Sequence, residues 1–187
     1  MTMKVTLFIC LIITFIFFCS SKTTTTGTIN WWCTQTPYNQ TCNHYVAEGK
    51  NSTATVSINQ FLDITVNAAE EEARVVLKRA QGIEATYPNP PEKTLWHSCV
   101  DDFDEAVFTL NMVLDHTHQP SPDDILTWIS DSVTDVDMCE EEFENMNITT
   151  TMLPALTTNL TQLLLNSLAI SVAINGGNPP GLNEMEV

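Results

Sequence analysis

Residues 94–117 read TLWHSCVDDFDEAVFTLNMVLDHT, and this stretch decides the fold class. Its apolar and small residues recur every three or four positions, the spacing of one face of a helix. That face carries Trp96, Cys99, Phe103, Ala106, Val107, Leu110, Val113 and Leu114. Acidic and polar residues occupy most of the remaining positions. The stretch is therefore predicted to form an amphipathic helix with one buried side.

Two similar patterns follow. Ser121-Pro122-Asp123-Asp124 supplies an N-cap, a proline at the first helical position and acids beside the positive end of the helix dipole. The helix that begins there is predicted to bury Ile125, Ile129, Val133, Val136, Cys139 and Phe143. A last helix is predicted from about 151–154 to Ile174, before GGNPP at 176–180, and it is expected to bury Leu153, Leu156, Leu160, Leu163, Leu164 and Ile170.

An earlier helix is predicted over 57–81. Ser57 and Gln60 form a capping box, and Gly82 is expected to end the helix in the left-handed conformation. Its buried face is predicted to carry Ile58, Phe61, Leu62, Thr65, Ala68, Ala69, Ala73, Val76 and Ala80. Four amphipathic helices with short connections predict an all-α fold, an antiparallel four-helix bundle.

The cysteines predict two disulfides. If the second and third helices pack antiparallel about a turn near Gln119, Cys99 and Cys139 each lie twenty residues from that turn. Both are then about 30 Å away at 1.5 Å per residue, so they meet at the same end of the bundle. Cys33 and Cys42 remain to join across a turn at 36–39, which makes a small disulfide-linked hairpin ahead of the bundle.

The N-terminus predicts secretion. Lys4 precedes an apolar run at 5–18, and the small residues Cys19, Ser20 and Ser21 follow it. Fourteen apolar residues are too few for a membrane anchor, which needs about 20, so residues 1–21 are predicted to be a signal peptide and no membrane contact is expected after cleavage. A helical domain is expected over 29–175 and a flexible tail over 176–187. Four sequons fit the glycosylation pattern, at Asn39, Asn51, Asn147 and Asn159.

The charge excludes some partners and the motifs argue against catalysis. The chain has 7 Lys and Arg against 23 Asp and Glu, a net charge of −16, which argues against nucleic acid and anionic membranes. The acidity fits either solubility in an acidic medium or attraction to a basic partner. Hydrolase and phosphate-binding motifs are absent from the sequence, and His116 and His118 point to different sides of a helix end. We therefore predict a binding protein with no enzyme activity, cofactor or metal.

Four segments, taken in order, resemble the plant pectin methylesterase inhibitor family, which includes invertase inhibitors and the pro-regions of many pectin methylesterases. The segments are 32–37 (WCTQTP) with Cys42, 98–107 (SCVDDFDEAV) with Leu110, 127–130 (TWIS) leading to 139–143 (CEEEF), and Asn166 before Leu168-Ala169. The resemblance spans about 29–174. It implies an α-helical hairpin before a four-helix bundle, the same disulfides, and inhibition of an extracellular cell-wall pectin methylesterase in the apoplast by capping its substrate cleft.

The helical wheel indicates where such a partner would bind. Opposite the buried face, the second helix carries Asp101, Glu105, Phe108 and Met112, with Thr109 beside them. The third helix carries Thr127, Asp131, Thr134 and Met138 outward, with Ser130 at the margin. These ten residues should form one acidic surface with apolar residues in it. The alternative is that Phe108 and Met112 cover a neighbouring loop.

Departures from the family pattern keep other functions open. Met138 stands where family inhibitors often have threonine, and the Pro-Lys-Phe tripeptide of invertase inhibitors is absent, which makes invertase the less favoured target. The start INWWC at 29–33 resembles esterase pro-regions more than free-standing inhibitors. A pro-region that aids esterase folding, an invertase inhibitor and a non-inhibitory bundle therefore remain alternatives. The sequence leaves the oligomeric state open.

Overall fold

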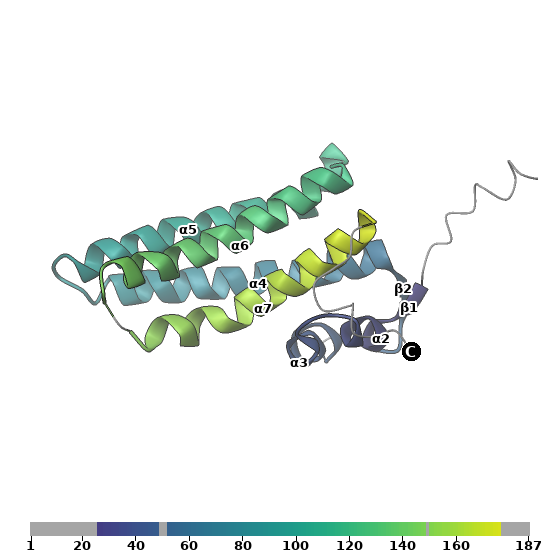
Figure 1. The fold of residues 1–187 in the computed structure, drawn as a ribbon, viewed down its shortest axis with the longest axis horizontal. Coiled ribbons are helices and arrows are strands. Elements are labelled where there is room, and N and C mark those ends of the chain that lie inside the picture. The colour runs from purple at the N-terminus through teal and green to yellow at the C-terminus, as the bar shows by residue number, and fades with distance from the viewer. Residues whose placement is uncertain (1–25, 49–51, 149, 177–187) are drawn as a thin grey trace, which may run out of the picture.

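Four long helices form the body of the molecule in this computed structural model, which describes residues 26–48, 52–148 and 150–176 (Figure 1). They are α4 (Ile58–Glu84), α5 (Glu92–Leu114), α6 (Pro122–Asn145) and α7 (Met152–Ile174). Successive helices pack side by side, and α7 closes the arrangement against α4. The prediction of an all-α, four-helix bundle is confirmed.

The predicted apolar faces form the core. The largest fully buried side chains come from all four helices and include Phe61, Trp96, Phe103, Ile129 and Leu160. Ile58, Leu114, Ile125 and Val133 are only partly buried but pack against this core. The periodic spacing therefore identified most of the core residues, because each helix presents one continuous apolar face to its neighbours.

The predicted caps are present, but α5 ends at Leu114 rather than Thr117, and the predicted stop at one glycine is wrong. Ser57 and Ser121 both form capping boxes, with Gln60 and Asp124 respectively. Gly82 does not end α4, since the helix continues to Glu84 and is capped by Ala85 in a right-handed conformation. A glycine costs only about 1 kcal/mol inside a helix, and the packing of Ile83 against the core favours the additional turn.

A small hairpin packs against one end of the bundle, beside α7 (Figure 1). It consists of α2 (Ile29–Thr34), α3 (Asn39–Cys42) and a π-helical turn, η1 (Asn43–Ala47). A short antiparallel ribbon of β1 (Thr26–Thr28) and β2 (Thr55–Ser57) joins its start to the start of α4. The sequence did not predict this ribbon, because three-residue strands are too short to show alternation.

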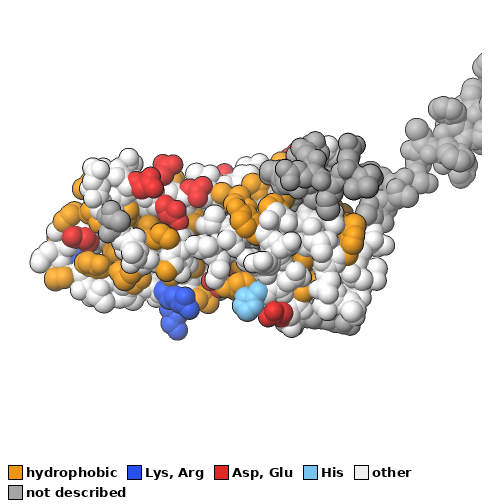
Figure 2. Space-filling model, turned by 60° about the horizontal axis from the view of Figure 1, so that its bottom comes forward, with side chains coloured by type: hydrophobic (Ala, Val, Ile, Leu, Met, Phe, Trp, Pro, Cys, Tyr) orange, Lys and Arg blue, Asp and Glu red, His pale blue; other side chains and the backbone are white. Residues whose placement is uncertain are grey.

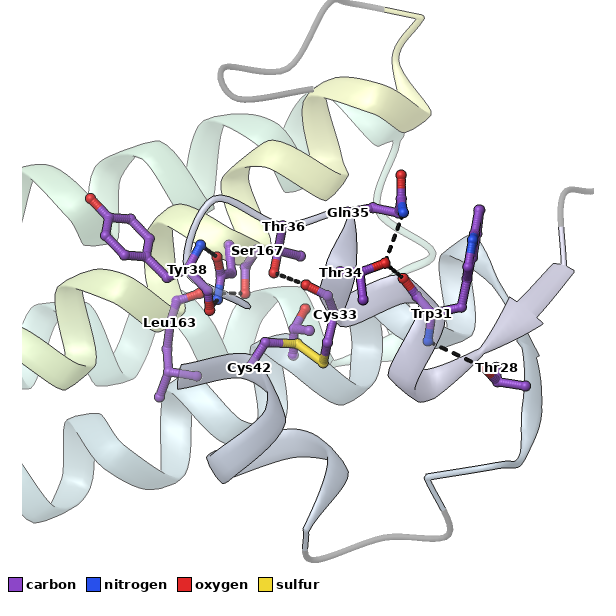
Figure 3. The surroundings of a disulfide bond; sticks show 12 residues. Thr28, Trp31, Cys33, Thr34, Gln35, Thr36, Tyr38, Cys42, Leu163 and Ser167 are labelled. Carbon is purple, nitrogen blue, oxygen red and sulfur yellow. Dashed lines mark hydrogen bonds between the residues drawn. A yellow bond between two sulfur atoms is a disulfide. The ribbon is translucent and has the colours of Figure 1, made fainter. Parts of the chain in front are cut away.

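The hairpin is closed by its own disulfide and packs on the bundle through an aromatic stack. Cys33 and Cys42 form the predicted disulfide, and both are fully buried beside Leu163 and Ser167 of α7 (Figure 3). Trp32 stacks on Phe61 with ring centroids 5.8 Å apart. The hairpin is therefore continuous with the core and is not a separate appendage.

Helix α7 is the most apolar element. Within the described residues it alone has the length and composition to cross a membrane, yet half of its most apolar window is buried inside the protein. Leu153, Leu160, Leu163 and Leu164 fill the bundle interior, as in a core helix. The predicted signal peptide at 1–21 and nearly all of the predicted tail lie outside the described residues.

Candidate partner-binding surface

The helix pair α5 and α6 is fixed by the predicted Cys99–Cys139 disulfide. Cys99 and Cys139 form a bond with an S–S distance of 2.01 Å and a Cα–Cα distance of 4.8 Å. Counting away from these residues in opposite directions brings Phe108 level with Ser130, and Met112 level with the turn that contains Thr127. A 3-10 turn, η2 (His116–His118), and a left-handed Gln119 with φ of 46° connect the helices.

Nine of the ten predicted surface residues are at least partly accessible. The exposed fractions are 59% for Phe108, 45% for Met138 and 36% for Met112. Asp101, Glu105, Thr127, Asp131 and Thr134 are also exposed, and Ser130 is half-buried. The structure thus leaves large apolar side chains in water among carboxylates on one helix pair.

Thr109 was wrongly assigned to the exposed stripe. Its side chain is only 6% exposed, and its hydroxyl donates to the backbone oxygen of Glu105 at 2.8 Å. The neighbouring helices are close enough to cover this margin of the α5 face, which a helical wheel of one helix cannot show. We therefore exclude Thr109 from the contact residues.

The hydroxyl groups on α6 are already engaged as donors. Thr127, Ser130 and Thr134 each donate to the carbonyl four residues earlier on α6, at 2.9, 2.9 and 3.0 Å. Their oxygens keep free lone pairs, so together with the carboxylates they can only accept further hydrogen bonds. A partner rich in donors, such as one with arginine and lysine side chains, would match this surface.

Two aspartates that the sequence did not single out lie between the helices. The Oδ2 atoms of Asp102 on α5 and Asp135 on α6 are buried and have no hydrogen-bond partner in the described part of the chain. Burial, followed by repulsion from neighbouring carboxylates, raises the pKa of each to about 6. On a helical wheel both fall at the border between the buried and exposed faces, and acidic residues flank both, so nothing distinguishes them before the helices are packed.

Other apolar side chains are also exposed. Trp31, Tyr38, Val75, Met146 and Met152 all exceed 36% exposure. Cations in the described residues are concentrated on α4, at Arg74, Lys78 and Arg79, with Lys93 at the start of α5. Figure 2 shows most of the acidic side chains on this face near its upper left, and a group of Lys or Arg at its lower edge. The predicted contact residues other than Thr109, here named the α5–α6 surface, differ in placing three exposed apolar side chains, Phe108, Met112 and Met138, on one disulfide-linked helix pair.

The best-formed pocket in the described residues contains one acidic and one basic side chain and no group of metal ligands. This pocket of about 320 Å³ lies at the end of the bundle, where Asp63 and His116 pair at 3.9 Å above Leu62 and Ile174. Burial raises the pKa of Asp63, and His116 opposes that rise. Among the residues described here, no three His, Cys, Asp or Glu side chains are grouped as metal ligands.

Three of the four sequon asparagines are described. Asn39 begins α3, Asn147 lies between α6 and α7 with φ of 54°, and both are exposed. Asn159 is exposed on α7, where its amide nitrogen donates to the Tyr45 hydroxyl at 2.8 Å. Asn51 lies outside the described residues. Their glycosylation stays a prediction.

Comparisons with known proteins give relatives among pectinesterases. "Probable pectinesterase/pectinesterase inhibitor 17" of Arabidopsis thaliana is 28% identical over 149 residues, covering 80% of this chain and 29% of the relative. "Pectinesterase 2" of Citrus sinensis is 26% identical over 140 residues, covering 75% and 28%. The chain thus spans less than a third of the length of these curated relatives.

Solved structures and the family model agree with this likeness. A mutant form of a pectin methylesterase inhibitor from Arabidopsis superimposes with a TM-score of 0.60 at 18% identity, covering 74% of this chain and 91% of the other. A pectin methylesterase inhibitor from Arabidopsis thaliana gives 0.55 at 18%, covering 76% and 93%. These two likenesses show a shared fold. Residues 27–170 match the family model described as plant invertase/pectin methylesterase inhibitor. Because that match covers most of the chain, the protein belongs to the plant invertase/pectin methylesterase inhibitor family.

Proposed function

We propose that this protein is a secreted inhibitor of a plant cell-wall pectin methylesterase, which it binds near the substrate cleft through the α5–α6 surface. The observation that carries the proposal is the exposure of Phe108, Met112 and Met138 among carboxylates on one disulfide-fixed helix pair. Exposed apolar groups clustered with charges are typical of binding sites.

The energetics of such a surface favour a basic partner. Aromatic side chains near the centre of an interface commonly supply much of the binding energy, and surrounding charges steer the encounter. Phe108 has the position for the first role, while Asp101, Glu105 and Asp131 have the charge for the second. Because exposed charges are screened by salt, affinity should fall as ionic strength rises.

A titration against two enzymes tests the proposal. Purified protein is added to a pectin methylesterase and, separately, to an acid invertase, across acidic to neutral pH. We expect stoichiometric loss of esterase activity and no loss of invertase activity. Full esterase activity in the presence of excess protein would refute inhibition, and loss of invertase activity alone would reassign the target.

Two variants test the surface. Phe108→Ala should raise the inhibition constant by about 30-fold, the effect of losing an aromatic hot spot of about 2 kcal/mol. Glu105→Lys should weaken inhibition by reversing a steering charge. Val75→Ala is the matched control, because Val75 is a 40% exposed apolar residue on α4. Helical circular dichroism should be unchanged in all three, and equal inhibition by Phe108→Ala and Val75→Ala would place the contact elsewhere.

A second candidate function is a pro-region that assists esterase folding. The observation in its favour is that the relatives bear the names of pectinesterases and the chain aligns with less than a third of their length. In that case the protein should raise the yield of refolded esterase when added in trans without slowing the mature enzyme. A non-inhibitory bundle should affect neither enzyme nor refolding.

Secretion to the apoplast is part of the proposal. It rests on the apolar run at 5–18 and on the presence of two disulfides, because disulfides form and persist in oxidising compartments. Expression in plant cells should yield a secreted chain whose first residue, by N-terminal sequencing, is Lys22. Retention of residues 1–21 in an intracellular product would contradict it.

A further inference from the structure

The boundary between α5 and α6 contains two carboxyl groups that lack the partners buried charges usually have. Both side chains are half-buried, and the Oδ2 atom of each is buried and accepts no hydrogen bond from the described residues. An ionised carboxylate in such a place loses part of its hydration without a compensating donor. The two groups come from different helices, so the unfavourable environment is created only when α5 and α6 pack.

Charged groups facing this pair are all acidic. Repulsion from Glu142 and Asp101 raises the pKa of Asp102. Repulsion from Glu105, Asp102 and Asp131 raises the pKa of Asp135. Each ionised neighbour makes ionisation of the pair less favourable.

The other two helices supply no compensating cation. Helix α7, which packs on α6, contains no charged residue. Helix α4 packs on α5, and its Arg74 donates hydrogen bonds to Glu70 and Asn111. The charge of Arg79 lowers the pKa of Tyr45 and Glu72, not of the aspartate pair. Lys78 is exposed on the same helix. Proton uptake is therefore the route by which the helix boundary can lose its repulsion.

We propose that Asp102 and Asp135 form a proton-binding pair between α5 and α6, which takes up a proton in acidic medium and then holds the two helices of the contact surface together more firmly. A bound proton removes one negative charge and adds an O–H donor at a place where the described part of the chain supplies none. The pair would thus adjust the rigidity of the α5–α6 surface to the acidity of its surroundings.

The sign of the pH effect follows from where the proton binds more tightly. Burial and repulsion raise the pKa of both carboxyls to about 6 in the folded chain, against about 3.9 in an unfolded one. Between these values the folded state binds more protons, so the stability contributed by the pair increases as the pH falls from about 7 to about 4. Above pH 7 the pair is ionised in both states and its destabilising effect is complete.

Carboxyl titration of the mature chain tests the pair directly. The ¹³C chemical shifts of the aspartate side chains are followed by NMR from pH 3 to pH 8 in the wild type and in Asp135→Asn. We expect at least one of the two macroscopic midpoints to lie above pH 5, and the midpoint of Asp102 to fall when Asp135 is neutral. Two midpoints below pH 5, or an Asp102 midpoint that does not move in the variant, would overturn the proposal.

Thermal melts supply a second readout. Asp102→Asn and Asp135→Asn should each raise the melting temperature at pH 7 by about 2–4 °C and lose part of the gain that the wild type shows on acidification to pH 5. Asp104→Asn is the matched control, since Asp104 is exposed on the same helix and lies outside the α5–α6 surface. Both pair variants melting like this control at pH 5 and pH 7 would count against the pair.

The consequence for inhibition rests on the proposed function. The ratio of inhibition constants at pH 7 and pH 5 should be about fivefold larger for the wild type than for Asp102→Asn, a coupling of ordinary size. Comparing variants against one esterase at each pH removes the titration of the enzyme itself. Absence of any inhibition would refute the proposed function alone, whereas equal ratios with normal inhibition would refute the coupling alone.

Discussion

Asn166 shows how one side chain can attach a small element to the bundle. It is fully buried on α7, where its amide oxygen accepts from the backbone nitrogen of Tyr38 at 2.9 Å and its amide nitrogen donates to the Tyr38 oxygen at 3.1 Å. The amide therefore satisfies both backbone groups of the residue before α3, as a β-bridge partner would. Tyr45 and Thr41 add polar contacts from the same hairpin to α7.

Replacing Asn166 by alanine should loosen the hairpin. Asn166→Ala leaves the partly buried backbone nitrogen and oxygen of Tyr38 without their partner, so we expect the free energy of unfolding to fall by about 1–3 kcal/mol. Urea denaturation followed by circular dichroism measures this loss. Asn145→Ala, at an exposed position near the end of α6, should change stability by less than about 0.5 kcal/mol. Equal stabilities for the two variants would mean that the Asn166 contacts contribute little.

At the scale of elements, the two disulfides act on different parts of the same core. Cys99–Cys139 joins residues 40 apart in sequence on two long helices, whereas Cys33–Cys42 joins residues 9 apart within the hairpin. All four of these disulfide-bonded cysteines are fully buried. The Cys33–Cys42 bond acts on more than a local hairpin, because the hairpin itself packs against α7 and α4.

Removing either disulfide should therefore lower the stability of the fold, and the loss should be larger for the disulfide that closes the longer loop. The chain-entropy model assigns about 4 kcal/mol to the longer loop and about 2.6 kcal/mol to the shorter one. We expect Cys99→Ala with Cys139→Ala to lose more stability than Cys33→Ala with Cys42→Ala, by urea denaturation. The first pair should also weaken esterase inhibition at a temperature where both variants remain helical. Stronger inhibition loss in the hairpin variant would point to a contact surface at the hairpin.

Across the whole molecule, charge is unevenly distributed. The net charge of −16 coexists with a group of cations on α4, while α7 has no charge at all. Repulsion among the acidic side chains destabilises the compact chain. The same negative charge attracts a basic partner. Folding and binding should therefore respond to salt in opposite directions.

Raising NaCl from 20 to 200 mM should test this opposition. The melting temperature of the free protein should rise, because repulsion among carboxylates is screened, while the inhibition constant against the esterase should increase. Glu105→Gln should reduce the salt dependence of inhibition, whereas Phe108→Ala should weaken inhibition and leave that dependence unchanged. Inhibition that strengthens with salt would contradict an electrostatic contact.

Much of the fold was predictable from local sequence. The spacing in 94–117 and in the three other helices depends only on 3.6 residues per turn, and the capping boxes at Ser57 and Ser121 are local hydrogen bonds. The pairing of Cys99 with Cys139 followed from equal distances to one turn. The positions of the exposed Phe108 and Met138 on the outer faces followed in the same way.

Only the packed structure decided which border residues are buried. Thr109, Asp102 and Asp135 occupy the margins of helical faces, and their exposure depends on how close a neighbouring helix lies, which no single-helix pattern contains. The continuation of α4 past Gly82 and the bond from Asn166 to Tyr38, 128 residues away, likewise depend on contacts between distant segments. Periodicity along one helix is a local property set by the backbone, whereas burial at a border is set by the distance between helices and exists only once they have packed.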